Sequence, residues 1–77
     1  MQFIIEITDT FGGEANYAWV KRAQFEAPAN ASDKQLIYRA KRALGACGRH
    51  KKENMGDTIR LNFVGACICA FIYPVEA

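Results

Sequence analysis

Residues 32–48 have the spacing of a single amphipathic helix, and this segment constrains the fold more than any other part of the chain. Ser32 and Gln35 match a capping box, in which the hydroxyl accepts from an early helix amide and the glutamine reaches back. Gly48 suits the left-handed conformation that ends many helices. Between them, apolar side chains form one stripe: Leu36, Ile37, Ala40, Ala43, Leu44 and Cys47. The sequence therefore predicts one helix with one apolar face to bury.

Outside this helix, apolar and polar residues alternate as they do in strands that bury one face. The alternation predicts strands over residues 3–8 and 59–63, β-rich residues predict one over 17–25, and an apolar run that ends at Pro74 predicts one over 67–73. Turn residues between 9 and 16 predict a hairpin that joins the first two strands. The adjacent Trp19 and Val20 interrupt the alternation and predict a bulge. Gly65 favours a tight hairpin between the last two strands, with one long strand bulged at the glycine as the alternative, and residues 54–57 read as a loop.

Together these elements predict an α+β fold of order ββαββ, a single domain over residues 1–77. In it, one amphipathic helix packs on one face of an antiparallel sheet. The strand over 67–73 is apolar on both faces, and Ile4 adds to the face opposite the helix. An uncovered apolar face is typical of an interface, so we expect a homodimer or a partner contact there. The alternative is that long side chains and loops of the same chain cover it.

The positive charge of the chain is concentrated in one segment. Seven of the ten Lys and Arg residues lie between 34 and 52, where no acidic residue occurs, although the net charge is only +2. Such a surface binds phosphates or acidic protein surfaces, and Tyr38 adds a stacking group. The alternative is a solvated helix face. The candidate binding residues are Lys34, Tyr38, Arg39, Lys41, Arg42, Arg49, His50, Lys51 and Lys52.

The cysteines and the one histidine do not assemble into a recognisable catalytic motif. Cys47 and His50 lack an orienting third group and an oxyanion cradle, which a nucleophilic site needs. Cys67 and Cys69, with Cys47 and His50, supply four zinc-type ligands, but a mid-strand Cys-x-Cys is unlike structural zinc turns. We therefore expect packed, reduced thiols, no metal, no cofactor and no enzymatic activity, and zinc binding stays open as the alternative.

Two further patterns bear on location and on the first hairpin. The chain has no leader-like start and no apolar run near the roughly 20 residues of a membrane span, which favours a cytoplasmic protein without a membrane partner. The segment around Gly12 and Gly13 lacks the Gly-x(4)-Gly-Lys-Ser/Thr pattern of a phosphate-binding loop, including its lysine. It reads as a hairpin turn, with a recognition loop carrying Phe11 at its tip as the alternative.

The stretch from Ile7 to Arg22, through Asp9-Thr10-Phe11-Gly12-Gly13-Glu14, resembles short proteins of bacteriophages and mobile elements. Compact phage proteins of this length include many anti-CRISPR inhibitors. The resemblance covers about the first third of the chain and implies a non-enzymatic inhibitor that docks on a host protein or a CRISPR ribonucleoprotein complex. The basic segment departs from inhibitors that mimic DNA, which are strongly acidic. A nucleic-acid-binding module using residues 34–52 is the alternative function.

Overall fold

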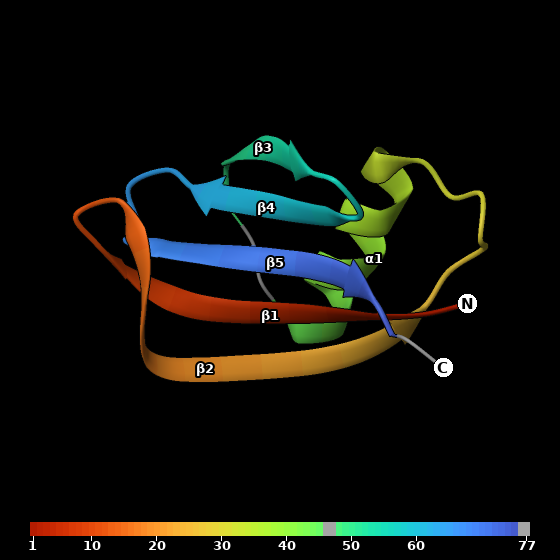
Figure 1. The fold of residues 1–77 in the computed structure, drawn as a ribbon, viewed down its shortest axis with the longest axis horizontal. Coiled ribbons are helices and arrows are strands. Elements are labelled where there is room, and N and C mark those ends of the chain that lie inside the picture. Colours follow the sequence, from red (N-terminus) through yellow and green to blue (C-terminus); the bar gives the residue numbers. More distant parts are fainter. Residues whose placement is uncertain (46–47, 76–77) are drawn as a thin grey trace.

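The computed structural model describes residues 1–45 and 48–75, which form five antiparallel strands and one helix (Figure 1). The sheet has the order β2-β1-β5-β4-β3, so the first strand pairs with both the second and the last. The predicted α+β class, with one helix on one face of an antiparallel sheet, is confirmed. The elements are β1 (Gln2–Phe11), β2 (Glu14–Glu26), α1 (Asp33–Leu44), β3 (His50–Met55), β4 (Thr58–Phe63) and β5 (Ile68–Pro74).

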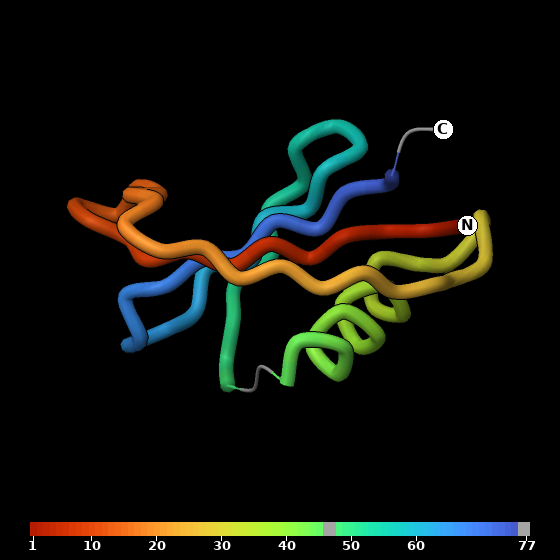
Figure 2. Tube along the Cα trace, turned by 90° about the horizontal axis from the view of Figure 1, so that it is seen from below, coloured from red at the N-terminus to blue at the C-terminus, as the bar shows by residue number. Residues whose placement is uncertain are grey.

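The core lies between α1 and one face of the sheet, as the alternation in the sequence requires. Directly paired residues point to the same face, so Ile5, Ile72 and Ile59 form a row across three strands. Ile5 and Ile72 are almost completely buried, and Ile37 and Ala40 cover the sheet from the helix. Figure 2 shows α1 on this side of the sheet only. The face opposite α1 is called the open face below.

Both ends of α1 are defined by local hydrogen bonds. Ser32 caps the first turn through the predicted capping box with Gln35. The helix ends at Leu44, because Gly45 takes the left-handed conformation (φ 74°) and its N–H bonds to the carbonyls of Lys41 and Arg42. The predicted end at Gly48 is therefore wrong, and the continuation of the apolar stripe to Cys47 lies outside the described residues.

Strand β3 is the element that the sequence did not predict. Residues 50–55 pair with β4 at the edge of the sheet, and the loop predicted over 54–57 shortens to a turn at Gly56 and Asp57. Every residue of β3 except His50 is exposed, whichever face of the sheet it points to. The strand therefore lacks the alternation of buried apolar and exposed polar residues by which a strand is predicted. The fold is accordingly ββαβββ. The hairpin predicted at Gly65 is confirmed, since β4 and β5 are paired neighbours.

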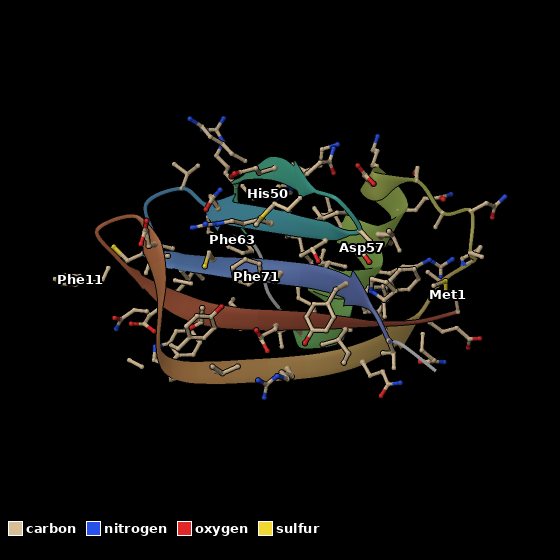
Figure 3. The ribbon with its side chains drawn as sticks, in the orientation of Figure 1. Met1, Phe11, His50, Asp57, Phe63 and Phe71 are labelled. Atoms are coloured by element: carbon tan, nitrogen blue, oxygen red, sulfur yellow. The ribbon has the colours of Figure 1, made fainter. Side chains whose placement is uncertain are left out.

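The open face is largely covered by its own side chains. Ile4, Phe71 and Tyr73 lie on it and are only half-buried, but none is among the strongly exposed apolar residues. The guanidinium of Arg60 lies 5.7 Å from the centroid of the Phe71 ring, which Figure 3 shows on β5. Arg22 pairs with Glu6 at 2.6 Å beside them. The geometry thus supports the alternative of self-coverage, and the homodimer through this face stays a prediction.

The β1–β2 hairpin contains the predicted bulge, which is larger than one residue. Thr8 pairs with Val20 but Thr10 pairs with Ala15, so residues 16–19 lie opposite Asp9 alone. The Asp9 carboxylate accepts hydrogen bonds from the Asn16 side chain and from the Ala18 backbone N–H, both at 2.9 Å. These bonds, led by that from Asn16, hold the pKa of Asp9 below its ordinary value.

Candidate interaction surface

The structure brings three of the predicted binding residues together beside the edge of the sheet. Tyr38, Arg39 and Arg42 line a groove of about 580 Å³ between α1 and the end of β2. This α1–β2 groove is completed by residues that the basic pattern did not indicate: Phe25, Glu26, Gln35 and Ala43. Charged, aromatic and aliphatic groups therefore share one concave surface.

Two guanidinium groups in the groove are held by neutral partners. Arg42 Nη1 donates to the hydroxyl of Tyr38 at 3.1 Å, and its guanidinium lies 5.6 Å from the centroid of the Tyr38 ring. Arg39 Nη1 donates to the backbone carbonyl of Glu26 at 3.4 Å. The ion pairs among the described residues are Arg22–Glu6 and Lys52–Asp33, so neither groove arginine has a carboxylate partner there. Tyr38 is 61% exposed.

Three other predicted residues make contacts that support the fold on the opposite flank of α1. Lys41 Nζ donates to the Gly48 carbonyl at 2.9 Å and lies 3.4 Å from His50 Nδ1. Burial, and then the charge of Lys41, lower the pKa of His50. Lys52 pairs with Asp33 at 3.3 Å, which joins β3 to the first turn of the helix.

The remaining three predicted residues lie apart from the groove. Lys34 and Arg49 are exposed on α1 and just before β3. Lys51 points to the open face, because its neighbours His50 and Lys52 point to the helix side and side chains alternate along a strand. The basic segment is thus continuous in sequence but divided in space, since α1 and β3 turn its side chains in different directions.

The thiols occupy two different environments. Cys69 is fully buried on β5, and burial raises the pKa of its thiol. Cys67 is exposed in the turn before β5 and has a positive φ of 52°, so its predicted packing in a strand is wrong. Cys47 lies outside the described residues, so the four predicted zinc ligands cannot be placed together and zinc binding stays a prediction. Within residues 1–45 and 48–75, no three His, Cys, Asp or Glu side chains are grouped as metal ligands.

The strongest exposed feature outside the groove is aromatic. Phe11, Tyr17 and Trp19 of the β1–β2 hairpin are all exposed, and Phe11 is 81% exposed. In the sequence, the interrupted alternation at Trp19 and Val20 predicted a bulge in this hairpin, but it did not predict that the aromatic side chains there would be exposed.

The helix in the described part of the chain is too short and too polar to cross a membrane. Comparisons of the chain with protein-family models, with curated proteins and with solved structures found no match.

Proposed function

We propose that the protein is a non-enzymatic binding protein that docks its α1–β2 groove on an acidic surface of a host protein complex. The observation that carries the proposal is the pair Arg39 and Arg42, which share the groove with an exposed Tyr38 and have no carboxylate partner among the described residues. The resemblance of residues 7–22 to phage proteins makes a CRISPR effector complex the partner class, and inhibition of that complex the outcome.

The chemistry of the groove suits protein recognition. Tyr and Arg are the residue types that dominate the energetics of protein interfaces, because they combine a large apolar area with directed polar contacts. A carboxylate entering the groove would exchange the weak 3.4 Å contact of Arg39 with a carbonyl for a charge-assisted hydrogen bond. The Phe25 and Ala43 side chains supply apolar surface beside it.

The test is co-purification of the protein with purified CRISPR effector complexes, together with protection of phage in a plaque assay. The double variant Arg39→Glu/Arg42→Glu should bind at least about tenfold more weakly. Lys34→Glu/Lys51→Glu is the matched control, because it changes the net charge equally at two exposed positions outside the groove. Failure of the wild-type protein to bind any complex or to protect phage would contradict the proposal.

A nucleic acid is the second candidate partner, and the exposed Tyr38 ring beside the Arg42 guanidinium is the observation that favours it. The division of the basic segment limits the number of phosphates that one strand can meet. If Arg39 and Arg42 make the contacts, the slope of log affinity against log salt on duplex DNA should be only about −2. Affinity that is independent of salt would exclude this candidate.

A further inference from the structure

The end of the β1–β2 hairpin is an exposed apolar surface without a role in the proposed function. Phe11 is 81% exposed, Tyr17 55% and Trp19 43%, and all three lie within nine residues of one hairpin. Figure 3 shows Phe11 projecting from the end of the molecule, away from the sheet. Large aromatic side chains exposed together in this way are uncommon on a monomer and are typical of contact sites.

The aromatic hairpin end is held in one conformation by polar contacts. Thr8 Oγ1 donates to the Trp19 carbonyl at 2.8 Å, and Asp9 binds Asn16 and the Ala18 N–H across the bulge. Tyr17 has a φ of 58°, which a bulky side chain adopts only when surrounding contacts enforce it. A surface ordered before binding loses less entropy when it associates.

The charge of the hairpin end is opposite to that of the α1–β2 groove. Between residues 9 and 20 the charged side chains are Asp9 and Glu14, and Asp9 is engaged inside the bulge. Glu14 is the exposed acidic residue of this segment. Arg60 brings one positive charge to the turn, where its guanidinium donates to the Gly13 carbonyl at 3.0 Å, so Asp9, Glu14 and Arg60 together leave the hairpin end with one negative charge.

One copy of the chain cannot bring these two surfaces together. Val20 and Phe25 are five positions apart on the regularly paired part of β2, which corresponds to about 17 Å along the strand, and Tyr17 lies in the bulge beyond Val20. Figure 2 shows the hairpin end at one end of the long axis and α1 between the middle of the molecule and the other end. Contact between the surfaces therefore requires a second copy. Pairing through the sheet edges is disfavoured, because β2 carries Lys21 and Arg22 and β3 carries Lys51 and Lys52.

We infer that the protein self-associates head to tail, with the aromatic hairpin end of one copy seated in the α1–β2 groove of the next. Phe11 and Trp19 meet Tyr38 and the apolar lining, and Glu14 meets Arg39 or Arg42. This contact joins two different surfaces, so it extends into chains or rings instead of closing at two copies. The inference rests on the groove being the binding site of the proposed function, and it makes self-association a competitor of the acidic partner.

Sedimentation velocity over a series of protein concentrations tests the inference. The weight-average mass of the wild-type protein should rise past that of a dimer as concentration increases. Phe11→Ala/Trp19→Ala removes the hairpin contact, and Arg39→Glu/Arg42→Glu removes the groove contact, so each variant alone should associate at least about tenfold more weakly. Their folding is checked by circular dichroism, and all four altered side chains are exposed.

Mixing the two variants gives the sharpest result. The hairpin variant retains a groove and the groove variant retains a hairpin, so the mixture should form a complex of one copy of each and grow no further. Trp19, the one tryptophan of the chain, should shift its emission to shorter wavelength in that complex. A wild-type protein that stays monomeric, or a groove variant that associates as strongly as the wild type, would overturn the inference. The hairpin variant should still bind the partner of the proposed function, which separates failure of one proposal from failure of the other.

Discussion

Lys41 and His50 show how cationic residues that were predicted to bind a partner are used inside the fold. Lys41 lies between the Gly48 carbonyl and His50 Nδ1, and its ammonium is 5.8 Å from the centroid of the Phe63 ring. His50 packs edge-on against the same ring (Figure 3). Protonation of His50 would place two positive charges 3.4 Å apart at a partly buried position, which is unfavourable.

The stability of the protein should therefore fall as the pH drops below 6.5. The pKa of His50 is lowered in the folded state, so the unfolded chain takes up the proton first and is stabilised by it. Urea unfolding at about pH 7.5 and about pH 5.5 should show a smaller loss of stability for His50→Gln than for the wild type. Lys41→Gln should also reduce the loss, because it removes the repelling charge. Equal losses in all three proteins would show that His50 does not carry this dependence.

At the scale of elements, the sequence predicted the structures that rest on local chemistry. The capping box at Ser32, the hairpins and the bulge near Trp19 all follow from residues close together in the chain. Strand β3 could not be predicted in this way, because its backbone is held by pairing with β4 and its side chains are exposed. The helix end was predicted at Gly48 and lies at Gly45, because glycine at either position can take the left-handed conformation and the sequence does not show which one does.

The capping box makes a quantitative prediction for α1. Ser32 Oγ accepts from the Gln35 N–H at 3.3 Å, and Gln35 Oε1 accepts from the Ser32 N–H at 3.0 Å. Ser32→Ala leaves an early amide without its partner and should lower the free energy of unfolding by about 1 kcal/mol. Ser32→Gly should cost only a few tenths of that amount, because glycine exposes the amides to water. Urea denaturation of the two variants measures the difference, and equal losses would contradict a capping role.

At the scale of the whole molecule, the candidate surface depends on how distant segments pair. The basic segment predicted Tyr38, Arg39 and Arg42 correctly as neighbours on one helix, but it did not predict the groove, because Phe25 and Glu26 come from the end of β2. It also placed Lys51 and Lys52 together, although strand alternation sends them to opposite faces of the sheet. Long-range pairing therefore decided which charges share a surface.

Because the sheet has a core face and an open face, we expect alanine substitutions on the two faces to lower the free energy of unfolding by different amounts. Ile4 and Ile5 are adjacent on β1 and point to opposite faces; Ile5 is completely buried, whereas Ile4 is half-buried beside Gln24 and Tyr73. Ile5→Ala should lower the free energy of unfolding by about 2–5 kcal/mol, since it opens a cavity under α1. Ile4→Ala should cost only about 1 kcal/mol, because water already reaches that side chain.

The same pair of variants tests the homodimer predicted from the apolar open face. If a second copy covers Ile4, the loss caused by Ile4→Ala should approach that of Ile5→Ala and should grow with protein concentration, because association adds to the stability of the folded state. If the side chains of Arg60 and Arg22 already cover this face, as their contacts with Phe71 and Glu6 indicate, the loss stays small at every concentration. Denaturation of both variants over a range of protein concentrations measures the difference. The head-to-tail contact leaves the open face exposed, so it predicts the second result even where the protein associates.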